Sequence, residues 1–178
     1  MTRDDVIRST AQHIRTVGLY LAGAIQNLTR RAVIHDQSKW SPEEWPAFED
    51  STPKLAGLTY GSEEYKAALR AIKPALEHHY KANSHHPEHF ESLCAQCGNT
   101  ESDPCICGGP RLPGGVNQMS LFDVIEMLCD WKAASERHNN GSIVASIKHN
   151  TERFNLSPQI VALLENTARE MGWMGGER

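Results

Sequence analysis

The stretch SLFDVIEMLCDWKAASERH, residues 120–138, decides the fold class. Its large apolar residues recur three or four positions apart: Leu121, Val124, Ile125, Leu128 and Trp131. This spacing is typical of one buried face of a helix. Ser120 precedes the first apolar residue, and Asp123 lies three residues after Ser120. This is the pattern of a helix N-cap. We therefore predict a helix over residues 120–138.

The same periodicity predicts helices along most of the chain. Residues 3–31 carry one apolar stripe: Val6, Ile7, Ile14, Val17, Leu21, Ala24, Ile25 and Leu28. Further helices are expected to begin at residues that favour the N-cap position: Ser41, Ser62, Ser142 and Ser157. Pro74 should kink the helix that begins at Ser62. No alternating strand pattern of useful length occurs, so the predicted fold class is all-α.

Composition indicates one soluble domain over residues 1–178, with a cysteine-rich insertion at about residues 90–116. A formal net charge of −4 argues against bulk coating of nucleic acid. The longest apolar stretch, Val17–Ile25, is too short to cross a membrane, and the acidic start MTRDD is unlike a secretory signal. We therefore expect a cytoplasmic protein without a membrane partner, and the sequence specifies no oligomeric state.

Histidine is unusually frequent, with nine residues, five of them between His78 and His89. Adjacent His35 and Asp36 form a usable metal corner if they occupy a helical turn. Asp130 interrupts an apolar helix face, and burying an unpaired carboxylate there would cost several kcal/mol, so it needs a cation or a strong donor. Imidazole and carboxylate ligands together favour Mn, Fe, Co, Ni or Zn over Mg or Ca.

Several charged residues near these positions are candidates for substrate or metal contact. Lys39 follows Asp36 by three residues and could hold a phosphate, as could Lys132 and Arg137. A solvated surface position is the alternative for each of the three. Asp123 and Glu126 share a helix face with Asp130. Either could contact a metal, or Asp123 could be a helix cap and Glu126 a partner of a histidine. The roles of His78 and His89 stay open.

Four cysteines lie within fourteen positions: Cys94, Cys97, Cys105 and Cys107. In a reducing compartment this spacing favours a four-coordinate structural zinc site over disulfides. A redox pair and a loop without a ligand are the alternatives. Cys129 stands alone in an apolar helical pattern, where we expect a small buried side chain.

The order of these motifs resembles the HD-domain superfamily of metal-dependent phosphohydrolases. The matching positions are His13, the run HDQSK at residues 35–39, His79, the pair His85-His86, and DWKAASER at residues 130–137. More narrowly, HDQSKW, YGSEEYKAAL, NSHHPEHF, MSLFDVIEMLCDWKAASERH and SIKHNTERF are similar to an uncharacterised HD-type family common in bacteriophage and bacterial genomes. This narrower resemblance covers most of the chain.

The resemblance implies a helical bundle that surrounds a metal centre. Its implied first ion is held by four residues: His13, His35, Asp36 and Asp130. A second ion, where present, shares Asp36 and adds His79, His85 and His86. The run HHPEHF lacks the Gly-Tyr-Pro motif of the dinuclear signalling phosphodiesterases in this superfamily, so hydrolysis of cyclic dinucleotides is not implied.

The expected function is hydrolysis of a phosphoester, with a nucleotide or nucleotide derivative as the small phosphorylated substrate. Asp36, Lys39 and Arg137 are the expected catalytic residues, and Lys39, Lys132 and Arg137 the expected substrate-binding residues. One alternative is an HD-type diiron oxygenase. Another is a non-catalytic binding or regulatory protein that acts through its zinc loop. The host cytoplasm is the expected location if the chain is phage-encoded.

Overall fold

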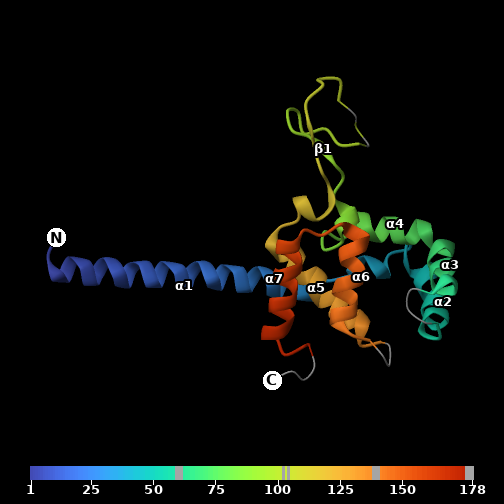
Figure 1. The fold of residues 1–178 in the computed structure, drawn as a ribbon, viewed down its shortest axis with the longest axis horizontal. Coiled ribbons are helices and arrows are strands. Elements are labelled where there is room, and N and C mark those ends of the chain that lie inside the picture. Colours follow the sequence, from blue (N-terminus) through green and yellow to red (C-terminus); the bar gives the residue numbers. More distant parts are fainter. Residues whose placement is uncertain (59–61, 102, 104, 138–140, 175–178) are drawn as a thin grey trace. The chain divides into compact units, whose positions relative to one another are not determined.

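The computed structural model describes residues 1–58, 62–101, 103, 105–137 and 141–174. These residues form seven α-helices, three short 3-10 helices and one two-stranded sheet, which confirms the all-α prediction (Figure 1). The chain divides into two units, residues 1–35 and residues 36–178. None of the helices in the described ranges combines the length and apolar character that crossing a membrane requires.

The first unit consists of the helix α1 (Arg3–Ile34). Its first turn is closed by a capping box, in which the Thr2 hydroxyl accepts from the Asp5 backbone N–H and the Asp5 carboxylate accepts from the Thr2 backbone N–H. The helix ends where His35 donates its backbone N–H to the carbonyl of Arg31 at 2.8 Å. No residue of α1 is buried, so the hydrophobic core belongs to the second unit.

The second unit begins with the 3-10 helix η1 (Gln37–Trp40) and the helix α2 (Trp45–Ala56). The prediction that Ser41 caps this helix is wrong by three residues, because the N-cap is Glu44. Proline has no backbone N–H to donate in a helix interior, and a helix from Ser41 would place Pro46 in its second turn. With the start at Trp45, Pro46 lies in the first turn, where it is tolerated.

The segment after Ser62 forms two helices, α3 (Glu63–Ala71) and α4 (Lys73–Ala82), in place of the predicted kinked helix. The Ser62 hydroxyl accepts from the Tyr65 backbone N–H at 3.1 Å, as its predicted cap role requires. Pro74 lies in the first turn of α4, so the missing N–H breaks the chain into separate helices. Helix α4 then carries His78 and His79, as predicted.

The cysteine-rich segment contains the 3-10 helix η2 (Pro87–His89), the strands β1 (Leu93–Cys94) and β2 (Arg111–Leu112), and the 3-10 helix η3 (Gly115–Gln118). The strands pair antiparallel, with Leu93 opposite Leu112 and Cys94 opposite Arg111. The hairpin between them carries the four clustered cysteines.

The core is built by α5 (Leu121–Ser135), α6 (Ile143–Phe154) and α7 (Pro158–Glu170), which pack side by side (Figure 1). Its buried residues come from these helices and the α6–α7 turn: Met127, Leu128, Ile143, Ile147, Leu156, Leu164 and Ala168. Ser120 and Asp123 form the capping box of α5. The predicted end of this helix at His138 lies outside the described residues.

Candidate metal centre

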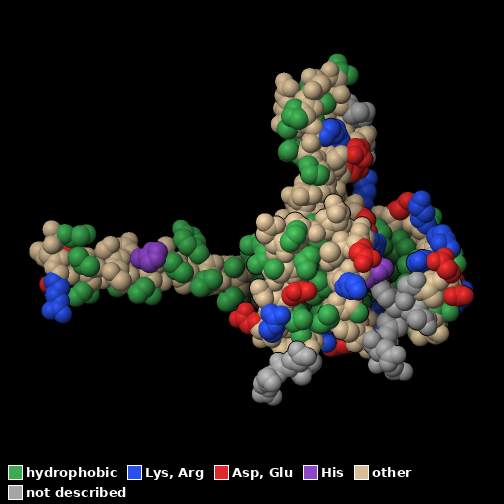
Figure 2. All heavy atoms as spheres, in the orientation of Figure 1, with side chains coloured by type: hydrophobic (Ala, Val, Ile, Leu, Met, Phe, Trp, Pro, Cys, Tyr) green, Lys and Arg blue, Asp and Glu red, His purple; other side chains and the backbone are tan. Residues whose placement is uncertain are grey.

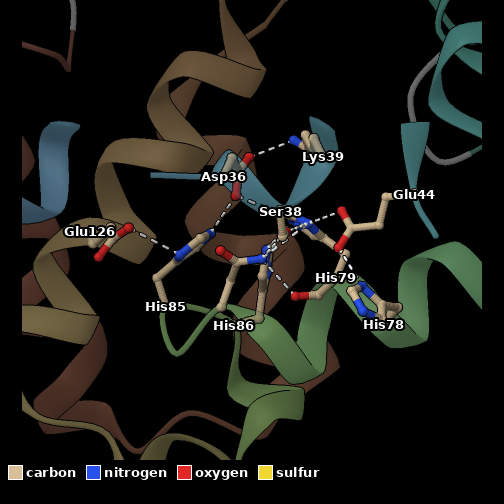
Figure 3. Close-up of polar contacts among 10 residues, drawn as sticks. Asp36, Ser38, Lys39, Glu44, His78, His79, His85, His86 and Glu126 are labelled. Atoms are coloured by element: carbon tan, nitrogen blue, oxygen red, sulfur yellow. Dashed lines mark hydrogen bonds and ion pairs between the residues drawn. The ribbon is translucent and has the colours of Figure 1, made fainter. Parts of the chain in front are cut away.

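Four side chains of the second unit meet at one point: Asp36, His79, His85 and His86. Oδ1 of Asp36 lies 3.2 Å from Nε2 of His79 and 3.3 Å from Nε2 of His85. The Nε2 atoms of His79 and His86 are 3.0 Å apart. Figure 3 shows these groups turned toward one another. Three imidazole nitrogens and one carboxylate oxygen therefore converge.

Local backbone structure brings these four residues together. Asp36 has a left-handed backbone with φ 56° directly before η1. His79 lies in the last turn of α4, and Asn83 closes that end by donating its side-chain amide to the His79 carbonyl at 2.8 Å. His85 and His86 follow within one turn, ahead of Pro87.

Two carboxylates, the buried Glu44 and the partly buried Glu126, orient two of the imidazoles. Oε2 of Glu44 lies 2.9 Å from Nδ1 of His79, and an oxygen of Glu126 lies 3.1 Å from Nδ1 of His85 (Figure 3). A carboxylate at Nδ1 accepts the ring proton there and leaves the Nε2 lone pair for a ligand. In both rings that Nε2 faces Asp36.

The electrostatics of the cluster favour the ionisation states that bind a cation. Burial raises the pKa of Asp36, but hydrogen bonds with His79 and His85 and the Lys39 ammonium outweigh burial and hold it well below its usual range. Burial, with His85 and His79 nearby, lowers the pKa of His86 to about 2. Asp36 is therefore a carboxylate and His86 a neutral ligand at pH 7.

The spacing of the donor atoms fits a transition-metal ion. Metal–nitrogen and metal–oxygen bonds of about 2.1 Å, at angles between octahedral and tetrahedral, separate neighbouring ligand atoms by about 3.0–3.4 Å. The three distances that join Asp36, His79, His85 and His86 are 3.0, 3.2 and 3.3 Å. The mixed nitrogen and oxygen donor set matches the predicted preference for Mn, Fe, Co, Ni or Zn.

The HD resemblance implies one ligand set for each of two ions, and the structure does not bring the two sets together equally. The set implied for the second ion, Asp36 with His79, His85 and His86, is brought together. Asp130 on α5 offers a carboxylate oxygen within 4.8 Å of one from Asp36. His35 caps α1 and does not share a helical turn with Asp36, but it still offers a ring nitrogen within 4.8 Å of a carboxylate oxygen of Asp36, so the predicted pair stays together.

His13 is separated from His35, another residue implied for the first ion, by the length of α1. Helix α1 is continuous from Arg3 to Ile34, and the side chain of His13 is exposed on it. At 1.5 Å per residue, His13 lies about 33 Å along the helix axis from His35. The two histidines of one chain therefore cannot hold the same ion, and that part of the implied ligand set is wrong for this structure.

The two acidic residues with open roles can now be assigned contacts. Asp123 is buried, accepts from the Ser120 backbone N–H at 2.8 Å and from the Ser84 hydroxyl at 2.6 Å, and is therefore a cap residue. Glu126 contacts His85, which matches its alternative role as a histidine partner.

The predicted cationic residues lie in different places. Lys39 Nζ is 2.5 Å from Oδ2 of Asp36, the oxygen turned away from the histidines. Arg137 lines the cavity that borders the side-chain cluster at His79 and His86. Lys132 instead pairs with Glu136 at 2.8 Å and lines a different hollow. Its placement gives no support to the predicted role in substrate binding.

A cavity of about 760 Å³ borders the cluster at His79 and His86. Most of its wall is aromatic or apolar: Trp40, Trp45, Phe48, Tyr65, Leu69, Ile72, Leu76 and Tyr80. Three cationic side chains also line it: Lys39, Arg137 and Arg153. This volume lies within the range of small-molecule sites, and the combination suits a ligand with both an apolar group and an anionic group.

The four hairpin cysteines form a second cluster. Sγ of Cys107 lies 3.3 Å from Cys105, 3.4 Å from Cys94 and 3.6 Å from Cys97. A tetrahedral zinc with bonds of about 2.3 Å separates its sulfur ligands by about 3.8 Å, whereas a disulfide needs about 2.05 Å. The observed distances are close to those of a metal site and exclude a disulfide.

Backbone N–H groups stabilise thiolates in this hairpin, and a glycine leaves space for the sulfur atoms. N–H groups of Cys97 and Gln96 lower the pKa of Cys94 to about 6. The Gly109 N–H lowers the pKa of Cys107, but the neighbouring sulfurs outweigh it and raise the value to about 12. A divalent cation relieves this crowding of sulfurs, because it stabilises all four thiolates together. A Cβ on Gly109 would lie 2.7 Å from Sγ of Cys94, so the cluster requires glycine there.

Two residues near the cluster could not be identified from the sequence as site residues. Glu44 is fully buried and contacts both His78 and His79, yet the sequence pointed only to Ser41, three residues earlier, as a helix cap. Arg153 lines the cavity and pairs with Glu88. No local pattern marks either residue, because their partners are distant in sequence. Cys129, expected to be buried, is exposed on α5.

Comparison with known proteins identifies a family whose function is unknown. No curated protein and no solved structure matches the chain. The HD-domain resemblance therefore stays a prediction. A family model described as DUF5662, a family of unknown function, matches residues 2–170. Because this match covers nearly the whole chain, the protein belongs to that family.

Proposed function

We propose that this protein is a metal-dependent phosphohydrolase that acts on a nucleotide or nucleotide derivative. The observation that carries the proposal is the convergence of Asp36, His79, His85 and His86, with Glu44 and Glu126 behind two of the rings. Buried imidazoles that are oriented by carboxylates are typical of metal ligands. A structural ion pair alone would not require three histidines around one carboxylate oxygen.

In this proposal, Asp36, His79, His85 and His86 hold a divalent transition-metal ion. Such an ion lowers the pKa of bound water and stabilises charge on phosphoryl oxygens. Glu44 and Glu126 keep the His79 and His85 rings in the tautomer that directs Nε2 to the ion. Lys39 stays on the outer oxygen of Asp36 and holds that carboxylate in place. We further propose that Cys94, Cys97, Cys105 and Cys107 hold a structural zinc ion.

The adjoining cavity supports the substrate class. The Trp40 and Trp45 rings stack with their centroids 4.7 Å apart, and both line the cavity, where they offer a flat apolar surface to a base. Arg137 and Arg153 supply positive charge for a phosphate, which a guanidinium binds in bidentate geometry. A nucleotide combines the flat ring and the anion that such a wall accommodates.

The test begins with metal analysis of protein purified without added ions. Phosphate release from nucleoside mono-, di- and triphosphates is then measured with Mn, Co, Ni, Fe or Zn. We expect metal-dependent release from at least one nucleotide. Trp45→Ala should raise KM with unchanged metal content, whereas Trp173→Ala, in the other hollow, should leave KM unchanged. Absence of phosphate release from every nucleotide by metal-loaded protein would overturn the proposal.

The same experiment separates the two alternative functions. Three imidazoles and a carboxylate also suit iron, so a diiron oxygenase predicts oxygen consumption by the Fe(II)-loaded protein. A regulatory protein predicts loss of partner binding, with no enzymatic loss, when residues 94–107 are deleted. Nucleic acid is a poor partner for the hairpin, because residues 91–116 contain three acidic residues and one basic residue.

A further inference from the structure

The wall of the 760 Å³ cavity contains an acidic side chain that the proposed function does not use. Among the described residues that line this cavity, Glu49 is the one with a carboxylate. The lysine and arginine side chains of the wall are Lys39, Arg137 and Arg153. A carboxylate repels the phosphate of a bound nucleotide, so Glu49 can favour only another part of the ligand. A ligand that matches this wall therefore carries hydrogen-bond donors apart from its phosphate.

Glu49 lies one helical turn after Trp45 on α2. Residues four positions apart share a helix face, with their Cβ atoms about 5–6 Å apart. Both residues line the cavity, and Trp45 stacks on Trp40 with the ring centroids 4.7 Å apart. A base that stacks on these indoles therefore has an edge within reach of the Glu49 carboxylate.

The two arginines of the wall come from other elements. Arg137 follows α5, and Arg153 lies in the last turn of α6. Nη2 of Arg153 is 2.5 Å from Oε1 of Glu88, and its guanidinium lies over the Phe154 ring, 4.6 Å from the centroid. Figure 2 shows hydrophobic, acidic and basic side chains together over α2, α3 and α4, three helices that line the cavity. The base and the phosphate of a nucleotide thus have separate parts of the wall to bind.

The chemistry of a carboxylate distinguishes among the nucleobases. An ionised carboxylate only accepts hydrogen bonds, through two oxygens that lie side by side. The Watson–Crick edge of guanine presents two adjacent donors, N1–H and the 2-amino group. Adenine and cytosine place a ring-nitrogen acceptor beside the amino group, and uracil and thymine place one N–H between two carbonyls. Of the five common bases, only guanine therefore offers a donor to each carboxylate oxygen.

We propose that Glu49 selects guanine as the base of the nucleotide that this cavity binds. Its carboxylate accepts from N1–H and from the 2-amino group while the base stacks on Trp45. This inference rests on the proposed function, because it takes the cavity as a nucleotide site. Glu49 contacts the base and not the metal ion, so it determines specificity and leaves metal binding unchanged.

The test measures nucleotide binding without turnover. Full-length protein freed of its exchangeable metal is titrated with GMP, IMP and AMP in a calorimeter. IMP lacks only the 2-amino group of GMP, and AMP turns an acceptor nitrogen toward the carboxylate. We expect GMP to bind about tenfold more tightly than IMP, which is the effect of one hydrogen bond to a charged group, and AMP to bind more weakly than IMP.

Glu49→Gln and Asp50→Asn are a matched pair of variants, because each converts a carboxylate on α2 to an amide. Asp50 pairs with Lys54 at 2.6 Å and is not among the residues that line the cavity. Glutamine keeps one acceptor oxygen and turns a donor toward the other guanine N–H. Glu49→Gln should therefore lose the preference for GMP over IMP, with unchanged metal content, and Asp50→Asn should keep that preference.

The outcomes separate this inference from the proposed function. Equal affinities of the wild type for GMP and IMP, tighter binding of AMP, or a preference that persists in Glu49→Gln would each overturn the guanine assignment and leave phosphate release from another nucleotide possible. A GMP preference that depends on Glu49, without phosphate release from any nucleotide by the metal-loaded protein, would support the base assignment and overturn the proposed hydrolysis. Failure of all three nucleotides to bind would overturn the guanine site.

Discussion

Glu44 and His79 form a buried carboxylate–imidazole pair, with Oε2 and Nδ1 2.9 Å apart and the two side chains 0% and 3% exposed. The second oxygen of Glu44 contacts Nδ1 of His78 at 2.7 Å. One carboxylate from the turn before α2 thus sets the orientation of two neighbouring rings on α4. Because His79 presents Nε2 to Asp36, this pair connects the turn before α2 to the cluster of Asp36, His79, His85 and His86.

We expect Glu44→Gln to weaken metal binding by about 10–100-fold, as loss of a carboxylate behind a ligating histidine does. Glutamine has one acceptor oxygen for two imidazoles, so either His78 or His79 loses its partner. Metal affinity is measured by competition with a chromogenic chelator. The exposed neighbour Glu43→Gln serves as control. Unchanged affinity in Glu44→Gln would mean that the carboxylate does not act through His79.

Asp36→Asn should remove the exchangeable metal and lower phosphate release by at least about 100-fold, an effect of a few kcal/mol. Asparagine tolerates the left-handed backbone at φ 56°, which alanine adopts at a cost, so the fold is expected to stay intact. Metal content, turnover and helical circular dichroism are measured together. Asp50→Asn, exposed on α2, should change none of them. Full activity in Asp36→Asn would rule out this carboxylate as a ligand.

The two proposed metal sites should be separable. A closed thiolate site holds zinc more firmly than a histidine and carboxylate site that is open to solvent. Mild chelation should therefore abolish activity before it removes all zinc, and added Mn, Co or Ni should restore activity. Cys107→Ser should lose the tightly held zinc, whereas Cys129→Ser, outside the hairpin, should retain it. Zinc release is followed with a metallochromic dye.

If one equivalent of zinc is all that the protein binds, and Cys107→Ser removes it together with all activity, the histidine cluster is not a separate metal centre. The hairpin would then be the functional site. Gly109→Ala offers an independent check, because its methyl group meets Sγ of Cys94 and should also release the tightly held zinc.

The metal-free protein should lose stability as the pH falls below about 6.5. The folded chain keeps His86 neutral down to a pKa of about 2, while the unfolded chain binds a proton near pH 6.5. The unfolded state therefore binds more protons between these values, and this group alone lowers stability by about 1.4 kcal/mol per pH unit. Asp36, whose pKa is also lowered, adds to the loss below the ordinary aspartate pKa of 3.8.

Urea unfolding of chelator-treated protein between pH 7 and pH 4 measures this slope. His86→Gln should flatten it by close to one proton, and His149→Gln, at an exposed position on α6, should leave it unchanged. An equal slope in His86→Gln and the wild type would show that His86 is not held neutral by the fold.

The sequence predicted those parts of the fold that depend on neighbours in the chain. Ser62, Ser120 and Ser157 cap the helices predicted from them, because a cap hydrogen bond spans three residues. The start at Ser41 was three residues too early, and Pro46, from the same segment, lies in the first turn of the observed helix, where proline is tolerated. The clustering of the four hairpin cysteines was predictable too, because short spacing with glycine and proline leaves thiolates little room to separate.

For the candidate site, the sequence determined which residue types were available, and only the tertiary structure decided which of them meet. His79, His85 and His86 are recognisable as metal ligands from their kind and density. Glu44 is not, since its burial depends on α4, 34 residues away. The helix that carries His13 has an apolar stripe like those of the core helices. Periodicity alone does not show which residues pack against such a stripe. The length of α1 separates His13 from His35, and the helix predicted over residues 3–31 already implied most of that separation, although the family resemblance placed both residues on one ion.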